Sequence, residues 1–540
     1  MKKKATARPA KATSRQSTLN FPTSSEADLV AESTAAETST KSGAKSRRKR
    51  TADDADKHNK SHCDSSAPSA VETNGTQIPD GWCWTTFKDA TVNFDGQRVP
   101  IKKEDREGRS GEYPYYGASG VIDDIDDYLF DGEFLLVAED GANLLSRSTP
   151  IAFRASGKFW VNNHAHVVQP ANGVALRFIE YYLNSIDLKF FVSGSAQPKL
   201  NQANLNKIPI PLPSLPEQHR IVAEIEKQFT RLDAGVAALK RVQANLKRYR
   251  AAVLKAACEG RLVPTEAELW KDEGRRMKDE KKRAKPSDST SSFIPHTSSF
   301  ESGEALLARI LAERRKNWEG RGQYKEPVAP DTATLASLPD RWAWATVEQL
   351  TSLVATGATP YRGKPDYWKG GTIPWVTSGA LNDTAVRLAK EFITPLAIEE
   401  TNAKLFPPGT LLVALYGEGR TRGMVSELRI EAATNQACAA LLFSDYNSEL
   451  KAFVRVFLLK NYNDVRLLSS GGVQPNLSLS IVKQTKIPLP PLAEQTRIVA
   501  EVERRLSVVE ELEAVVSANL QRATRLRQSI LQKAFTGNLV

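Results

Sequence analysis

Two long stretches of the chain carry apolar side chains at alternating steps of four and three residues. This spacing places the apolar residues on one stripe of a helix and is typical of a coiled-coil seam. Each stretch, at about 45 residues, would form a helix spanning roughly 70 Å. The predicted seam residues are Ile225, Phe229, Leu232, Val236, Leu239, Leu246 and Val253 in the first stretch, with Val242 and Tyr249 between them, and Val502, Leu506, Val509, Val516, Leu526 and Ile530 in the second, with Leu512, Leu520 and Ala523 between them.

A proline-rich segment precedes each predicted helix. Ile210-Pro211-Leu212-Pro213 cannot be helical throughout, because each proline fixes its own φ and favours an extended residue before it. Pro216 and Glu217 suit a first helical turn, where a missing N–H is harmless and a negative charge favours the helix dipole.

Upstream of each proline-rich segment lies a body with short β-type runs and a helical pattern. In the first body, 134–138 and 165–168 are predicted strands and 175–188 a short helix. The second body repeats the scheme, with strands predicted at 411–416 and 439–443 and a helix around 450–459. Both bodies are therefore expected to be α+β domains.

The framework of the chain occurs twice. The segment 210–226 reads IPLPSLPEQHRIVAEIE and 487–503 reads IPLPPLAEQTRIVAEVE, and the two stay in register to the closing Gly-x-Leu-Val motifs. The openings 78–84 and 338–344 and the loops 193–200 and 470–477 also match, whereas the sequence between these anchors is divergent. Two modules with fixed ends and divergent bodies suggest one architecture that reads two targets.

These patterns predict six segments. They are a basic Ser/Thr/Ala-rich tail without a fold at 1–76, module 1 at 77–213, the first long helix at 214–263, a charged and partly helical linker at 264–337, module 2 at 338–490 and the second long helix at 491–540. Within the linker, 303–318 has helical spacing and 285–302 is Ser-rich and expected to be flexible.

A single apolar stripe must be buried, and the nearest partner of one long helix is the other. One interpretation is an ordinary helical hairpin or a homodimerisation stalk. The other is an intramolecular antiparallel pair that holds the two modules a fixed distance apart, and the linker is long enough to allow it.

Composition limits the class of protein. The net charge of +11 and the pI of about 9.2 favour a polyanionic partner. The longest apolar runs are strand-sized, so no membrane span is expected, and a cytoplasmic protein is predicted. The four cysteines have no Cys-x-x-Cys spacing and indicate reduced thiols, with neither a zinc site nor a disulfide framework.

The repeated pattern of divergent body, Ile-Pro-Leu-Pro, Glu-Gln-x-Arg-Ile-Val-Ala-Glu, long helix and Gly-x-Leu-Val resembles the specificity subunit of type I restriction-modification systems. The resemblance covers residues 78–540. The segments 160–167, 373–379 and 433–438 are similar to segments common in the target recognition domains of that family.

The resemblance implies a DNA-binding adaptor. In that family each divergent body reads one half of a split, asymmetric DNA target, while the paired helices set the gap and dock two modification subunits. Those partners bind S-adenosylmethionine and methylate adenine, and a restriction subunit uses ATP and Mg²⁺ to translocate and cleave. The fold implied is two target recognition domains of mixed α/β structure, separated by an antiparallel intramolecular coiled coil with a pseudo-two-fold repeat.

Motifs for catalysis by this chain are absent from its sequence. No Asn/Asp-Pro-Pro-aromatic motif of an adenine methyltransferase and no phosphate-binding Gly-x-x-x-x-Gly-Lys-Ser/Thr loop occurs, so no enzyme activity and no bound cofactor are predicted. His164 and His166 would share one strand face, but without further ligands nearby a hydrogen-bonding role is favoured over a metal.

Sequence readout requires Arg, Lys, Asn or Gln at base edges, with phosphate contacts to fix the register. For each candidate residue named next, an ordinary surface position without DNA contact is weighed equally with base or phosphate contact. The candidates are Arg98, Lys102, Lys103, Arg147, Gln197 and Lys199 in module 1, and Tyr361, Arg362, Lys364, Lys369, Arg420, Arg422, Gln474 and Asn476 in module 2.

A coiled-coil scaffold with two protein-binding modules is the alternative function. It would show no DNA sequence preference and little salt dependence, whereas phosphate binding weakens steeply with salt.

Overall fold

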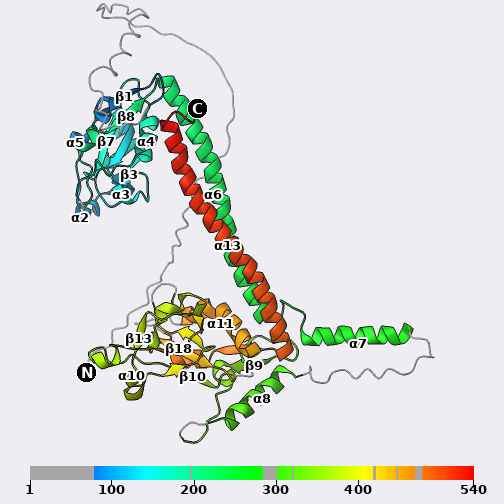
Figure 1. Ribbon diagram of the computed structural model, residues 1–540. Coiled ribbons are helices and arrows are strands. Elements are labelled where there is room, and N and C mark those ends of the chain that lie inside the picture. The colour runs from blue at the N-terminus through cyan, green and yellow to red at the C-terminus, as the bar shows by residue number, and fades with distance from the viewer. Residues whose placement is uncertain are drawn as a thin grey trace, which may run out of the picture. The chain divides into compact units, whose positions relative to one another are not determined.

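A computed structural model describes residues 78–540, except 195–196, 284–300, 319–321, 418–420, 445–447, 469–476 and 540 (Figure 1). The predicted tail at 1–76 lies outside the described residues, as does nearly all of the Ser-rich segment 285–302.

Module 1 is built on a sheet with the strand order β2-β7-β5-β6-β3-β4. A separate pair, β1 with β8, joins the start and end of the module, with Cys83 opposite Leu212. The predicted strands and the helix are all present. The elements are β1 (Cys83–Thr86), α1 (Phe87–Ala90), β2 (Thr91–Asn93), η2 (Asp95–Gln97), α2 (Lys103–Arg106), β3 (Ser110–Gly117), β4 (Gly120–Ile125), β5 (Phe130–Ala138), α3 (Asn143–Ser146), β6 (Ala152–Val161), β7 (Ala165–Pro170), α4 (Leu176–Ser185), α5 (Gln202–Asn206) and β8 (Pro209–Leu212).

Module 2 splits the corresponding strands between two sheets, ordered β10-β18-β15-β16-β12 and β13-β11-β17-β14. Strand β9 pairs with β19 as β1 does with β8. The helix predicted around 450–459 is longer than its apolar core suggested. The elements are β9 (Ala343–Thr346), α9 (Val347–Leu350), β10 (Leu353–Thr356), η4 (Pro365–Tyr367), β11 (Ile373–Val376), η5 (Ser378–Asn382), β12 (Ala385–Val386), β13 (Glu391–Ile393), α10 (Pro395–Glu400), β14 (Leu405–Phe406), β15 (Leu411–Ala414), β16 (Val425–Leu428), β17 (Ala432–Thr434), β18 (Cys438–Leu442), α11 (Ser448–Leu468), α12 (Leu479–Lys483) and β19 (Lys486–Leu489).

The two long helices, α6 (Leu215–Cys258) and α13 (Leu492–Phe535), pack against each other in opposite directions (Figure 1). Near the start of α6, the Arg527 guanidinium carbon lies 4.1 Å from the Phe229 ring centroid. Further along α6, Arg250 Nη2 lies 3.3 Å from Glu513 Oε2. Since the partner number falls as the α6 number rises, the helices run antiparallel.

The buried positions of the helix pair recur every seven residues. Val502, Val509, Val516, Ala523 and Ile530 are buried on α13. The seam prediction is wrong at Leu526, which is 48% exposed, and Val242, Tyr249 and Leu512 are exposed as well. A two-helix contact covers a narrow strip, so the second apolar position of the heptad stays at its edge.

Each module packs on one end of the helix pair. The Phe178 ring of α4 lies 5.1 Å from that of Phe535 at the end of α13, while α11 shares a hydrophobic core with the end of α6 and the start of α13. The terminal glycines explain the repeated Gly-x-Leu-Val. A Cβ on Gly260 would lie 2.6 Å from Pro339, and one on Gly537 would overlap Pro79, so both positions have room only for glycine.

The linker contains two helices, α7 (Glu266–Arg283) and α8 (Gly303–Lys316), in agreement with the helical spacing predicted at 303–318. Cys258 and Cys438 are free and buried, as expected. No helix among those described is both long and apolar enough to cross a membrane.

Candidate nucleic-acid interface

The divergent interiors of the modules share a backbone framework. In module 1, β3 runs parallel to β6, with Tyr115 opposite Trp160. In module 2, β11 runs parallel to β17, with Trp375 opposite Ala433. The two modules therefore share this parallel strand pair although their sequences differ there.

An asparagine closes the turn after this strand pair in both modules. Asn162 Oδ1 accepts from the N–H of His164 at 2.8 Å, and Asn435 Oδ1 accepts from the N–H of Ala437 at 3.1 Å. The Asn162 N–H donates to Tyr116 O, and that of Asn435 donates to Val376 O. These turns fix the ends of the strands from which the neighbouring loops project.

A cation-bearing loop follows the first sheet strand of each module. We call residues 94–109 the module-1 loop and residues 357–372 the module-2 loop. Trp160 Nε1 donates to Val99 O at 2.7 Å, and Trp375 Nε1 donates to Ala358 O at 3.1 Å, so a tryptophan of the strand framework holds each loop.

Arginines stack on these tryptophans. The Arg109 guanidinium carbon is 5.1 Å from the Trp160 ring centroid, and that of Arg362 is 5.1 Å from Trp375. Such stacking orients a guanidinium, and each of the two also pairs with a carboxylate of its own module, Arg109 with Asp126 and Arg362 with Glu391. Both loops thus present cations on an aromatic base, which fits contact with a polyanion.

Within module 1, Glu139 joins three loops. Its Oε2 accepts from Arg98 Nη1 at 2.8 Å, and its Oε1 lies 3.2 Å from Lys199 Nζ. Burial alone would raise the pKa of Glu139, but the hydrogen bonds and charges of Arg98, His166 and Lys199 hold it below its usual range. Two of the predicted cations are thereby brought together around one carboxylate.

Arg98 serves the inside of the module. Its guanidinium also donates to Ala165 O at 2.8 Å, and its side chain is only 14% exposed. His166 is fully buried between Asp95 Oδ2, at 2.6 Å, and Leu200 O, at 2.8 Å. His166 therefore has the hydrogen-bonding role predicted for the histidine pair, and His164 Nδ1 likewise lies 2.7 Å from Asp140 Oδ2.

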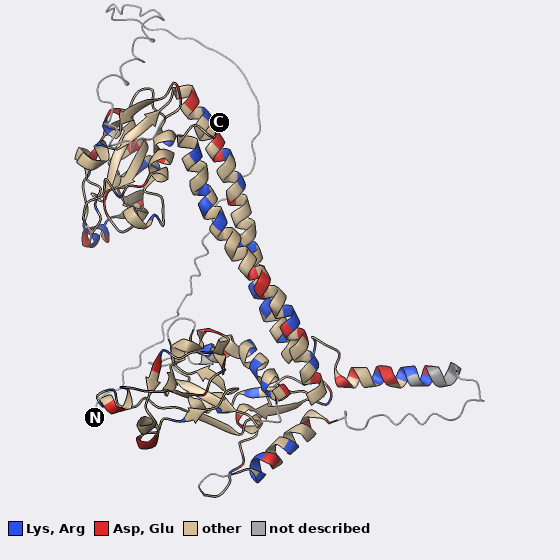
Figure 2. Ribbon diagram, in the orientation of Figure 1, with Lys and Arg blue, Asp and Glu red and all other residues tan. Residues whose placement is uncertain are grey.

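The remaining module-1 candidates are distributed differently. Lys102 and Lys103 are exposed at the start of α2, and Gln197 is exposed in the loop whose Pro198 O accepts from the Gly141 N–H. Figure 2 shows Lys and Arg residues interspersed with Asp and Glu on the long helices, so charge is not segregated there. The exposed cations of α2 are the better placed for phosphate contacts.

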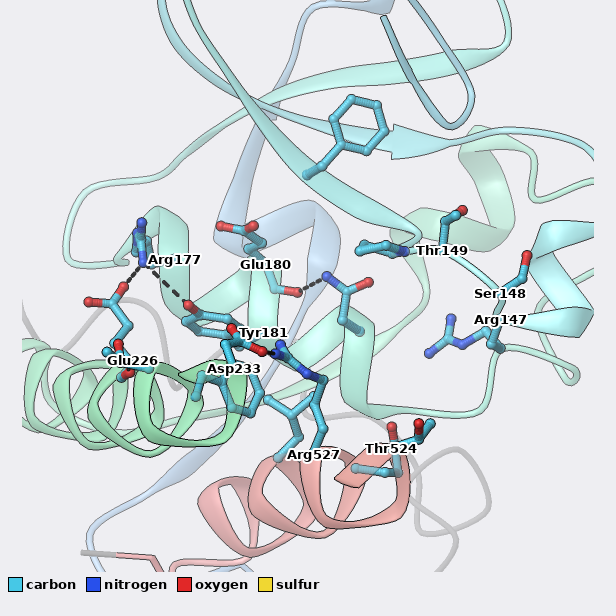
Figure 3. Close-up of a pocket in the computed structure, with 17 residues that line it drawn as sticks. Arg147, Ser148, Thr149, Arg177, Glu180, Tyr181, Glu226, Asp233, Thr524 and Arg527 are labelled. Atoms are coloured by element: carbon cyan, nitrogen blue, oxygen red, sulfur yellow. Dashed lines mark hydrogen bonds and ion pairs between the residues drawn. The ribbon is translucent and has the colours of Figure 1, made fainter. Parts of the chain in front are cut away.

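Arg147 lies elsewhere, at a cavity of about 700 Å³ between module 1 and the long helices (Figure 3). Its Nη2 donates to Ile186 O at 2.6 Å and Leu183 O at 3.2 Å, which caps the end of α4, and burial lowers its pKa. Across the cavity Arg177 pairs with Glu226, and Arg527 pairs with Asp233. Most of the charged side chains that line the cavity form ion pairs with one another. The cavity therefore marks where module 1 packs against the long helices.

Four of the module-2 candidates lie on the module-2 loop. Arg362 Nη1 lies 2.6 Å from Glu391 Oε2, and Lys364 Nζ lies 2.5 Å from Glu400 Oε2, a contact that raises the pKa of Lys364. Tyr361 and Lys369 are exposed on the same loop. The carbonyl oxygen of Arg422 accepts a hydrogen bond of 2.9 Å from Arg466 Nη1, while Arg420, Gln474 and Asn476 lie outside the described residues.

Sequence reasoning missed the residues that build these loops. Trp160 and Trp375 stood within the family-like segments but carried no assigned role, and Glu139 gave no signal. Within the described part of the chain, no three His, Cys, Asp or Glu side chains gather as a metal site requires.

Comparisons with known proteins agree with this geometry. Residues 84–244 and 339–514 match the family described as the type I restriction modification DNA specificity domain. A putative type I restriction enzyme specificity subunit of Haemophilus influenzae is 39% identical over 139 residues, which cover 26% of this chain and 35% of the relative. The EcoDI specificity subunit of Escherichia coli is 24% identical over 435 residues, 79% of this chain and 83% of the relative. A chain from a solved structure on assembly and conformational transition of the type I R-M system has a TM-score of 0.53 at 17% identity, covering 86% of this chain and 99% of that one. With both modules matched, the chain belongs to the family of type I restriction-modification DNA specificity domains.

Proposed function

We propose that this chain is a sequence-specific DNA-binding specificity subunit, which directs a type I restriction-modification complex to a bipartite, asymmetric target. The observation that carries this proposal is the repeated framework: two modules with matching strand pairs present different cation loops. One framework with two different reading surfaces suits a target of two unlike halves.

The antiparallel helices would act as the spacer. We infer a coiled coil with a pseudo-two-fold relation between the modules, supported by the seven-residue repeat of buried positions. Each helix has 44 residues, or about 66 Å at 1.5 Å per residue. Readers on one face of B-DNA are separated by about 34 Å per helical turn, which helices of this length can accommodate.

Two methyltransferase subunits would dock on the helix pair. Val508, Leu512 and Val515 form an exposed apolar stripe on α13, at spacings that share one helix face. Apolar residues left exposed in a row are typical of protein interfaces. Restriction subunits with translocase activity would join through the same complex.

The chain itself would be non-catalytic and act in the cytoplasm. S-adenosylmethionine, ATP and Mg²⁺ would be bound by the partner subunits, since this sequence lacks the motifs that hold them.

The test is adenine-methylation mapping of DNA from cells that express this chain with its modification subunit, compared with the subunit alone. A new two-part motif with an unspecified gap, present only with this chain, is expected. No new motif, with both proteins folded and bound to each other, would overturn the proposal and favour the protein-binding scaffold.

A further inference from the structure

The module-2 loop is held at several points. Trp368 Nε1 donates to Tyr361 O at 3.3 Å, and Tyr367 Oη donates to Glu400 Oε2 at 2.9 Å. The loop also begins in close contact with the sheet, because a Cβ on Gly357 would overlap the carbonyl of Thr434. A loop fastened in this way loses little conformational entropy on binding.

Arg362 strengthens the same loop from outside. Its guanidinium carbon lies 3.8 Å from the Trp368 ring centroid, while its Nη1 pairs with Glu391. Trp368 meets Trp375 edge to face at 5.2 Å between centroids. The arginine is therefore a positioning residue that completes an aromatic base.

Tyr361 projects from this base. Its side chain is 75% exposed although the residues on either side are fastened. Gly363 leaves space for the ring, since a Cβ there would lie 2.6 Å from it. A fixed loop keeps this large aromatic ring in contact with water, so the protein forgoes the free energy that burial of the ring would provide. Such exposure indicates that the ring is buried against a partner.

The surroundings of Tyr361 favour DNA as that partner. Lys369 is exposed on its loop, and Arg362 and Lys364 of the same loop form ion pairs with Glu391 and Glu400, so the ring is displayed beside cations. Cations with an interleaved aromatic ring suit a contact in which phosphates are neutralised while the ring stacks on a base.

We propose that Tyr361 inserts its ring at one base step of the half-target read by module 2, unstacking that step and kinking the duplex. The proposal rests on the proposed function. Apolar and aromatic wedges of this kind open base steps and bend DNA in other proteins.

The experiment uses the full chain assembled with its modification subunits, on a duplex with the motif found by methylation mapping. 2-Aminopurine replaces one base at a time through both halves, and its fluorescence and the Kd are measured. Apart from the adenines that the modification subunits methylate and so take out of the stack, the wild-type complex is expected to raise fluorescence at one step in one half. Tyr361→Ala should abolish that rise and increase Kd roughly 10-fold or more, whereas Tyr361→Phe should retain both.

Controls separate the outcomes. Leu353→Ala, which removes another exposed apolar side chain of module 2, should change neither value. Equal losses for Tyr361→Phe and Tyr361→Ala would assign the contact to the hydroxyl and overturn the wedge, as would unchanged fluorescence and Kd in Tyr361→Ala. A Tyr361→Ala chain that no longer binds its modification subunits would also overturn it, by placing the ring at a protein interface. A wild-type complex without sequence preference would instead defeat the proposed function itself.

Discussion

Trp342 Nε1 donates a hydrogen bond of 3.1 Å to Oε1 of Glu494, a residue with no exposed surface. Trp82 and Glu217 make the same bond in the other half of the repeat, also at 3.1 Å, but Glu217 is partly exposed. Each bond ties the opening of a module to the first turn of the helix that follows it. The two Trp–Glu pairs differ mainly in burial, so the same substitution in each pair measures the effect of burial.

Trp342→Phe should destabilise the chain more than Trp82→Phe. Removing the indole leaves a buried carboxylate oxygen without this donor, at a cost of about 1–3 kcal/mol, whereas water can reach Glu217. Urea unfolding of both variants followed by circular dichroism measures the difference. An equal or smaller loss for Trp342→Phe would contradict the assigned importance of burial.

The same carboxyl should make stability depend on pH. Burial raises the pKa of Glu494 above its usual range, and the hydrogen bonds from the Glu266 N–H and Trp342 only partly oppose this. A raised folded-state pKa means that the stabilising contribution is complete below the unfolded value of about 4.3 and is lost as pH rises through the folded value. The unfolding free energy of wild type minus that of Glu494→Gln should therefore fall between pH 4.5 and 7.5.

Glu501 supplies a control of opposite sign. Hydrogen bonds from Arg504 and Arg505 lower its pKa to about 2, so its stabilising contribution is present above the unfolded value and is lost as pH falls. Because Glu501 is partly exposed and its ion pairs are screened by solvent, the effect of Glu501→Gln should be small. A difference for Glu494→Gln that is flat with pH would show that burial does not raise the pKa of this carboxyl.

The helix pair offers a test of its buried strip. Leu246 packs with Val509 and Val516 at the middle of the pair, whereas Leu526 is half exposed. Leu246→Ala should cost about 2–5 kcal/mol, through lost burial and the cavity left behind, and Leu526→Ala should cost clearly less. Thermal and urea unfolding report both values, and similar losses would mean that Leu526 also lies in the seam.

Periodicity predicted the helices well because the spacing of apolar residues is a property of one segment. It could not tell which apolar position faces the partner helix, and so Leu526 was misassigned. The interiors of the modules were harder still. The pairing of β11 with β17 uses backbone groups, which leave no trace in side-chain identity, so Trp375 and Ala433 gave no sign of matching Tyr115 and Trp160, respectively.

Candidate cations show a similar limit. Arg98 and Lys102 look alike in the sequence, as basic residues of one loop, yet Arg98 is bound to Glu139 and Lys102 is exposed. Charge alone does not reveal whether an anionic partner is supplied by the same chain, because the carboxylate stands 41 residues away.

This contrast gives the prediction that most directly tests the interface. Lys102→Ala with Lys103→Ala should leave folding intact, weaken DNA binding of the assembled complex and reduce the slope of log K against log salt by about 1.8, at 0.9 per phosphate contact. Arg98→Ala should instead lower the unfolding temperature, because it removes a donor from Glu139 Oε2, whose other oxygen keeps Lys199, and from the carbonyl of Ala165. Lys247→Ala, on an exposed position of α6, is the control for loss of charge and should change neither property.

Salt titrations and melting curves on the same preparations separate the variants that weaken DNA binding from those that weaken folding. The contradicting result would be a lower salt slope for Arg98→Ala without a change in stability, together with no effect of the lysine pair. The module-1 loop would then bind DNA through Arg98, and the exposed start of α2 would not be the contact surface.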